Sequence, residues 1–214
     1  MKANVKFHLD TLIARYPVLE PIRSDIANMV MHIAACYERG GKLILAGNGG
    51  SCADAEHIVG ELMKGFKLPR HLDESLCEAL KAVDESRGAV LAQQLQQGLP
   101  AIALSSHPSL NTAFMNDVDG NLIYAQQLSV LGNRGDVFLG ISTSGNAKNI
   151  YDAAVVAKAK GMTVIALTGK DGGRLGKLAD IAVIMPCQET YQIQELHLPV
   201  YHCLCLMLEE HFFG

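Results

Sequence analysis

His57 and Glu61 are a pair of side chains whose types and spacing could do chemistry. They are four residues apart in a segment with a helical pattern, so they are expected on the same helix face. Imidazole and carboxylate groups bind zinc and related divalent cations, although such a site needs further ligands from elsewhere in the chain. The alternative is a solvated helix face, on which polar pairs at this spacing are common. The pair alone leaves both interpretations open.

A glycine-rich segment, Gly47-Asn-Gly-Gly-Ser51, precedes this helix and is called the glycine loop below. It follows an apolar run over 42–46 that is typical of a strand buried on both faces. Ser51 is predicted to be the N-cap of the helix, whose free backbone N–H groups would then face the turn. Neither the dinucleotide-binding nor the P-loop pattern fits, because Cys52 replaces the third glycine and no lysine follows. The loop predicts a phosphate site or, alternatively, a tight connection without a ligand.

A second polar loop, Ser142-Thr-Ser-Gly-Asn146, follows another apolar run and is called the hydroxyl loop below. Three hydroxyl groups and the start of the next helix would cradle a phosphate there. The alternative is an ordinary helix cap, since Ser, Thr and Asn are the usual capping residues. The presence of both loops in one chain favours the phosphate site.

The elements that position these loops are predicted to alternate between strands and helices. The expected strands are 42–46, 100–104, 136–141, 162–168 and 180–185, and the expected helices include 22–38, 109–115, 122–131, 147–160, 174–178 and 190–212. The expected fold is therefore an α/β three-layer sandwich, flavodoxin-like or Rossmann-like, with a five-stranded parallel sheet. In such a sheet the loops after the strands meet at the carboxyl edge.

The chain is expected to be a single domain over 1–214 with a helical insertion at about 66–98. Two short helices are predicted in the insertion, with the break near Gly88. Leu76, Leu80 and Val83 recur there at helical spacing and predict a narrow apolar stripe. We expect this stripe to pack over a pocket or a subunit contact.

Composition excludes several classes of protein. The chain has 214 residues, of which 49% are hydrophobic and 19% are charged, with a formal net charge of -4, so no basic field favours nucleic acid or an anionic membrane. Charges near the start argue against a secretory signal, and the uncharged stretch 89–116 is too rich in glutamine and proline for a membrane span. The six cysteines show no C-x-x-C spacing. They predict reduced thiols in a cytoplasmic protein.

The three loops or segments 47–51, 142–146 and Leu167-Thr-Gly-Lys-Asp-Gly-Gly173 resemble the sugar isomerase (SIS) domain. Over nearly the whole chain the sequence is similar to phosphoheptose isomerases. The resemblance implies an aldose–ketose isomerase that interconverts sedoheptulose 7-phosphate and D-glycero-D-manno-heptose 7-phosphate. It also implies a zinc ion and a homotetramer.

The resemblance further implies which residues form the site. Four of them match the zinc ligands, namely His57, Glu61, Gln194 and His202. Glu61 and His202 also match the acid/base pair, and their ligand and proton-transfer roles remain alternatives. The positions that match substrate contacts are Asn48, Gly49, Gly50, Ser51, Glu61, Asn116, Asp117, Ser142, Thr143, Ser144 and Gln194.

The chain departs from the family pattern at several positions. Ala147 replaces a phosphate-binding serine, Gly65 an arginine, and Tyr191 an aspartate, while the segment 63–99 is longer than its counterpart. The phosphate contacts are therefore expected to be rearranged.

Two other functions compete with a heptose phosphate isomerase. One is a non-catalytic SIS protein that binds a sugar phosphate or a protein partner, as relatives in replication initiation do. The glutamate and second histidine are substituted in those relatives, whereas Glu61 and His202 are both present here. The other is a SIS enzyme for another sugar phosphate, with the insertion reshaping its pocket.

The spacing of Gln194 and His202 raises a question of assembly. Eight residues of straight helix span roughly 12 Å, too far for both side chains to reach one metal ion easily. Either the helix starts or bends between them, for example at Pro199, or neighbouring protomers share each site. We expect shared sites in the homotetramer. His197 in the same helix is expected to be a hydrogen-bonded core residue.

Overall fold

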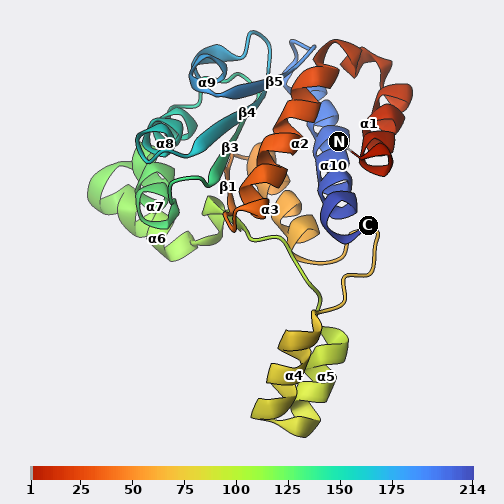
Figure 1. The fold of residues 1–214 in the computed structure, drawn as a ribbon. Coiled ribbons are helices and arrows are strands. Elements are labelled where there is room, and N and C mark those ends of the chain that lie inside the picture. The colour runs from red at the N-terminus through yellow and green to blue at the C-terminus, as the bar shows by residue number, and fades with distance from the viewer. Residues whose placement is uncertain (1) are drawn as a thin grey trace.

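The computed structural model describes residues 2–214, which form a central sheet with helices on both faces (Figure 1). The sheet has five parallel strands in the order β2-β1-β3-β4-β5. Their bounds are Leu43–Ala46 (β1), Ala101–Ala103 (β2), Val137–Ser142 (β3), Thr163–Gly169 (β4) and Ile181–Met185 (β5). The predicted three-layer α/β fold is confirmed.

One face of the sheet is covered by helices from both ends of the chain. These are α2 (Arg23–Glu38), α3 (Gly50–Met63) and α10 (Thr190–Phe213), while α1 (Ala3–Arg15) packs against α10 and is joined to α2 by a short 3-10 helix, η1 (Pro17–Ile22). Helices α7 (Ile123–Leu131), α8 (Lys148–Ala159) and α9 (Gly173–Leu178) cover the other face. Short η2 (Leu104–Ser106), α6 (Pro108–Phe114), η3 (Met115–Asp119) and η4 (Gly120–Leu122) connect β2 to α7. No helix of the described chain is long and apolar enough to cross a membrane.

Strand β1 shows why its sequence is apolar at every position. Leu43 and Leu45 belong to the core beneath α1, α2, α3 and α10, whereas Ile44 and Ala46 belong to the core beneath α7 and α8. Successive side chains of a strand point to opposite faces, and here both faces are covered. A continuous apolar run is therefore the pattern that this position in the sheet requires.

The turn after β1 differs in one detail from its prediction. Helix α3 begins at Gly50, and Gly49 at φ 55° occupies the cap position, so Ser51 is buried in the first turn and is not the N-cap. The reason is the tightness of the turn: a Cβ atom on Gly47 would lie 2.2 Å from the Ser51 carbonyl oxygen. Only glycine permits such a close approach of the backbone. The helix therefore begins at Gly50, one residue before Ser51.

The insertion is a pair of helices that extends away from the body (Figure 1). Helices α4 (Glu74–Val83) and α5 (Glu85–Gln94) are separated at Asp84, so the predicted break at Gly88 is wrong. Asp84 accepts a hydrogen bond from the Arg87 backbone N–H and caps α5. Gly88 instead allows close packing, because a Cβ atom there would lie 2.2 Å from the Leu80 carbonyl oxygen.

The base of this helical hairpin is attached to α3 and α10 by a buried ion pair. The Arg70 guanidinium lies 2.8 Å from Glu209, and their side chains are 0% and 1% exposed. Arg70 also donates to the carbonyls of Leu62 and Glu61, which end α3. Burial raises the pKa of Glu209, but hydrogen bonds from the Phe66 and Lys67 backbone and from Arg70 outweigh it, so that pKa is lowered.

Candidate functional site

The glycine loop and the hydroxyl loop follow neighbouring strands, β1 and β3, and are tied together at the carboxyl edge of the sheet. The Asn48 amide donates to the Asn149 side chain at 2.9 Å, and the Asn149 amide donates back at 2.9 Å. This reciprocal pair links the glycine loop to the first turn of α8. The two loops are thus held as one polar edge above the sheet.

The hydroxyl loop is fixed by close backbone contacts. Gly145 has φ 64°, and a Cβ atom there would lie 1.9 Å from the Gly172 carbonyl oxygen. The Asn146 N–H donates to Ser144 Oγ at 3.2 Å, and the Arg174 N–H donates to Asn146 Oδ1 at 3.1 Å. Ser142 is buried at the end of β3. The loop is a preformed cradle, which suits an anion better than a mobile loop would.

Helix α10 brings its polar residues to different parts of this edge. It begins at Thr190 and continues through Pro199 to Phe213, so a helix start between Gln194 and His202 is excluded. Gln194 lies against the first turn of α3, where a Cβ atom on Gly50 would lie 2.7 Å from Gln194 Nε2. Gln194 therefore belongs to the surroundings of the glycine loop.

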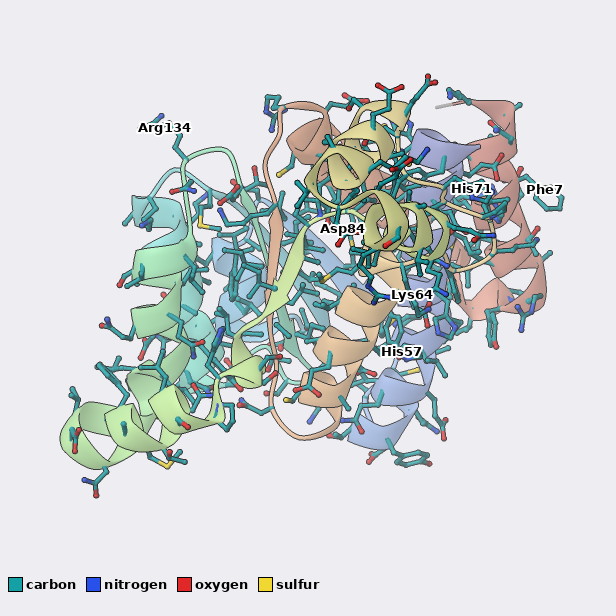
Figure 2. The ribbon with its side chains drawn as sticks, turned by 90° about the horizontal axis from the view of Figure 1, so that it is seen from below. Phe7, His57, Lys64, His71, Asp84 and Arg134 are labelled. Carbon is teal, nitrogen blue, oxygen red and sulfur yellow. The ribbon has the colours of Figure 1, made fainter. Side chains whose placement is uncertain are left out.

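His57, Glu61 and His202 form a cluster two turns further along α3. His57 Nε2 lies 3.2 Å from Glu61 Oε1, and the His57 and His202 ring centroids are 5.0 Å apart. Lys64 Nζ lies 2.9 Å from Glu61 Oε2, so both carboxylate oxygens have a partner. Figure 2 shows His57 on α3 and Lys64 at the C-terminal end of this helix, where Lys64 is the residue that follows the last turn. One protomer is enough to bring Glu61 and His202 together.

His202 has an unusual environment for a histidine. Burial and the neighbouring His57 charge lower its pKa, while Glu61 acts in the opposite direction. Its Nε2 atom is buried and has no hydrogen-bond partner among the described residues. A buried polar atom without a partner costs free energy, so the Nε2 atom of His202 is suited to binding a ligand at this candidate site.

The polar pair after β2 takes no part in this cluster. Asn116 and Asp117 are exposed in η3, where the Asn116 amide donates to Asp117 Oδ1 at 2.9 Å. The two side chains are hydrogen-bonded to each other. Among residues 2–214, neither is bonded to another candidate residue.

Two further residues, which are not among the predicted site residues, lie beside His57. The Tyr201 hydroxyl lies 3.0 Å from His57 Nδ1, and Asp54 faces the same hydroxyl. A sequence signal existed for Asp54, which is one helical turn before His57. None existed for Tyr201, which lies in a run of apolar residues.

Residues 2–214 contain no group of three or more His, Cys, Asp or Glu side chains with the arrangement of a formed metal site. His57, Glu61 and His202 are neighbours, but their donor atoms do not yet converge on one point. The three side chains nevertheless offer two imidazole nitrogens and one carboxylate, which are donors that zinc binds.

His197 is a core residue, as expected. It is 0% exposed, and its Nε2 lies 3.4 Å from the Thr168 carbonyl oxygen. Burial lowers the pKa of His197 to about 4, against 6.5 for an ordinary histidine. The unfolded chain therefore binds the proton more readily, and folding free energy is lost as the pH falls from about 6.5 to about 4.

We expect this loss to reach about 3 kcal/mol for His197 alone. Urea unfolding of the wild type and of His197→Gln at a series of pH values checks it, since the variant should lose less stability over this interval. Parallel pH curves for the two proteins would contradict the assignment.

Comparison with known proteins gives a consistent set of similarities. The SIS domain family model matches residues 79–169. The phosphoheptose isomerase of Geotalea daltonii is 39% identical over 91% of this chain and 88% of that protein. The phosphoheptose isomerase of Helicobacter pylori is 37% identical over 91% of this chain and 88% of that protein.

Solved structures show the same similarity to phosphoheptose isomerases. A phosphoheptose isomerase from Francisella tularensis has 30% identity and a TM-score of 0.73, covering 98% of this chain and 100% of that one. Another from Neisseria gonorrhoeae has 29% identity and a TM-score of 0.73, covering 96% and 97%.

Proposed function

Because the chain belongs to the phosphoheptose isomerase family of SIS-domain proteins, we propose that its substrates are sedoheptulose 7-phosphate and D-glycero-D-manno-heptose 7-phosphate. As a member of this family, the protein is an aldose–ketose isomerase of phosphosugars. The single observation that carries the finer proposal is the cluster of His57, Glu61 and His202 on the polar edge that holds both loops.

The proposed reaction moves a proton between adjacent carbons through an enediolate. This requires a base at carbon, a proton donor at oxygen and positive charge near the oxyanion. Glu61 is our candidate for the base and His202 for the group that transfers the oxygen proton. Ser51 of the glycine loop and Ser142, Thr143 and Ser144 of the hydroxyl loop would bind the phosphate, with Asn48, Gly49, Gly50 and Gln194 lining the sugar. Asn116 and Asp117 lie in η3, apart from the His57, Glu61 and His202 cluster, and would contact the substrate from there.

We also propose a divalent cation, zinc, as the cofactor. His57 Nε2, Glu61 Oε1 and His202 Nε2, which has no hydrogen-bond partner within residues 2–214, are donors of the kind that zinc binds. Gln194 lies by the glycine loop of its own chain and would complete the proposed set from a neighbouring subunit. When bound, the ion would supply positive charge beside the developing oxyanion. Glu61 as ligand and Glu61 as base remain alternative roles for one carboxylate.

Zinc content tests this cofactor. Protein purified without chelator should hold about one zinc per chain, and adding zinc to stripped protein at about 100 times Kd should stabilise it by about 2.7 kcal/mol. His57→Gln should lose the ion. His211→Gln, which alters a histidine of α10 paired with Glu38, is the matched control and should retain it. Stripped protein that neither binds zinc nor gains stability from it would remove the metal from the proposal.

Ser142 tests the phosphate site. Ser142→Ala should raise KM by about 10- to 100-fold, because it removes a hydrogen bond to a charged group. The phosphate is remote from the reacting carbons, so kcat should change little. Ser129→Ala, at an exposed position in α7, is the control. Loss of kcat with an unchanged KM would assign Ser142 to the chemistry instead.

A turnover screen of ketose 5-, 6- and 7-phosphates tests the substrate. Sedoheptulose 7-phosphate should have the highest kcat/KM. A preference for another ketose phosphate would support the alternative SIS enzyme, in which α4 and α5 reshape the pocket. Binding of sugar phosphates without any turnover would support the non-catalytic alternative, a protein that binds a sugar phosphate or a protein partner.

We further propose a cytoplasmic homotetramer with sites shared between subunits. All six cysteines are free, as a reducing compartment favours. Exposed apolar side chains offer contact surface: Phe7 on α1 is 63% exposed and points outward (Figure 2), and Val130 on α7 is 70% exposed. Since Glu61 and His202 meet within one chain, a neighbouring subunit would contribute other residues.

A further inference from the structure

Arg174 is an exposed cation at the carboxyl edge of the sheet, at the start of α9. It takes part in none of the ion pairs within residues 2–214. Asp171, the nearest carboxylate in sequence, accepts a hydrogen bond from the Gly173 N–H instead. The positive charge of Arg174 is therefore not neutralised by a carboxylate of the described chain.

The Arg174 guanidinium is held against an aromatic ring. Its Cζ atom lies 4.0 Å from the ring centroid of Tyr151, the half-buried fourth residue of α8. The Arg174 backbone N–H donates at 3.1 Å to Oδ1 of Asn146, the last residue of the hydroxyl loop. A cation–π contact restricts the guanidinium without removing its charge. Arg174 is thus a positioned cation beside the hydroxyl loop.

Helix stability does not explain a cation at this place. Peptide dipoles make the start of a helix positive, so acidic residues stabilise a first turn and basic residues do not. Helix α8 nevertheless begins with Lys148, and Arg174 is the second residue of α9. The hydrogen bond to Asp152 raises the pKa of Lys148 and the Arg174 charge acts in the opposite direction, so the two cations are near each other. Such a concentration of positive charge becomes favourable when an anion binds there.

The hydroxyl loop beside Arg174 adds a buried polar group. Ser142 is only 7% exposed, and its hydroxyl forms no hydrogen bond within residues 2–214, whereas Ser144 Oγ accepts one from the Asn146 N–H. The N-cap of α8 is Ala147, which has no side-chain oxygen to cap the helix. A hydroxyl and a guanidinium are both donors, and an anion with several oxygen atoms can accept from both.

We propose that Arg174 is a binding residue for the phosphate group of the sugar phosphate, and that Tyr151 positions it. This inference rests on the proposed function, which supplies the ligand. A guanidinium can donate to two phosphate oxygens at once, so Arg174 would contact the phosphate from one side while the hydroxyl loop donates from another. The phosphate is remote from the reacting carbons, so Arg174 contributes to binding and not to proton transfer.

Arg174→Met in the full chain is the direct test. The dissociation constants for sedoheptulose 7-phosphate and for inorganic phosphate, measured by calorimetry, should each rise about 10-fold, because a hydrogen bond between charged groups is lost. KM should rise by a similar factor, while kcat stays unchanged. Added NaCl should weaken binding more steeply in the wild type than in the variant, since salt screens the charge that the variant lacks.

Tyr151 is tested through its ring. Tyr151→Leu should raise the same dissociation constants about 2- to 5-fold, because the guanidinium loses its platform. Tyr151→Phe keeps the ring and should restore wild-type affinity. The double variant Arg174→Met/Tyr151→Leu should bind no more weakly than Arg174→Met alone, because the ring acts through the guanidinium. Fully additive losses would show that Tyr151 acts on its own and would overturn its positioning role.

Arg134→Met is the matched control. Arg134 is an exposed arginine in the turn before β3, at the opposite edge of the sheet, and its side chain extends away from the body (Figure 2). Its removal should leave affinity and KM as in the wild type.

Wild-type affinity of Arg174→Met for both ligands would overturn the inference, even in an active isomerase. A wild-type protein that binds neither ligand would also overturn it. Binding of sedoheptulose 7-phosphate without turnover would reject the proposed reaction, whereas weaker binding of it by Arg174→Met would still uphold the inference. The two failures are therefore distinguishable.

Discussion

Replacing Glu61 with glutamine is expected to lower kcat by about 100- to 10,000-fold, the range that a general base contributes. Glutamine keeps the shape of the side chain and can still accept a hydrogen bond from Lys64, but it cannot take up a proton. Binding of the sugar phosphate should survive, because the phosphate loops follow β1 and β3. Steady-state kinetics and direct binding of sedoheptulose 7-phosphate measure the two effects separately.

Glu38→Gln is the control for this substitution, since Glu38 is a carboxylate on α2 that pairs with His211. It should leave kcat unchanged. Near-normal turnover by Glu61→Gln would remove the carboxylate from the chemistry.

Mixing two inactive variants shows whether the catalytic pair belongs to one chain. His57 Nε2 is 3.2 Å from Glu61, and the His57 and His202 rings are 5.0 Å apart in the same protomer. Mixed oligomers of Glu61→Gln and His202→Asn chains should therefore recover no activity, as every site carries one defect. Recovered activity after subunit exchange, followed by native mass spectrometry, would assign Glu61 and His202 of one site to different subunits.

Breaking the Arg70–Glu209 pair is expected to cost about 3–5 kcal/mol of unfolding free energy, because one buried charge is left without its partner. Arg70→Met leaves the Glu209 carboxylate with backbone donors alone and also uncaps the last carbonyls of α3. Glu209→Gln leaves the Arg70 guanidinium without a carboxylate. Urea unfolding at one fixed protein concentration measures both losses.

An exposed ion pair provides the comparison. Lys158 and Asp180 lie 2.6 Å apart with side chains 39% exposed, and Lys158→Met should cost no more than about 1 kcal/mol. Equal losses for Arg70→Met and Lys158→Met would contradict the special role of burial. Because Arg70 holds the turn that carries Glu61, Arg70→Met should also lower kcat.

The fold was accessible from sequence wherever a local pattern and the tertiary environment agree. Strands β1, β3, β4 and β5 read as apolar runs because both faces of the sheet are covered. Ser51 and Gly88 show where local patterns fail. Ser51 has a capping side chain, but the turn is so tight that Gly49 takes the cap position. The local pattern at Gly88 predicts a helix break, whereas this glycine allows the close contact between α4 and α5.

The candidate site also contains residues that a local pattern predicts and residues that only tertiary packing brings together. His57 and Glu61 share a helix, so their proximity follows from spacing. The approach of His202, 141 positions beyond Glu61, depends on how α10 packs against α3 and is not contained in any local pattern. Asp54 and Tyr201 join the site through the same packing. Arg70 and Glu209, also far apart in sequence, are charged residues that a composition-based reading assigns to the surface.

The paired ends of the helical hairpin have a consequence for how the chain folds. His71 and Gln96 form an antiparallel bridge, so the chain leaves the body and returns to it at nearly the same point. Once α4 and α5 have formed, the residues between His71 and Gln96 act as a short connection, and they add little to the entropy cost of closing the loop between β1 and β2. Strand β2 can therefore find β1 as quickly as it would without α4 and α5. Such a segment can be lengthened, shortened or exchanged between relatives without slowing the assembly of the core.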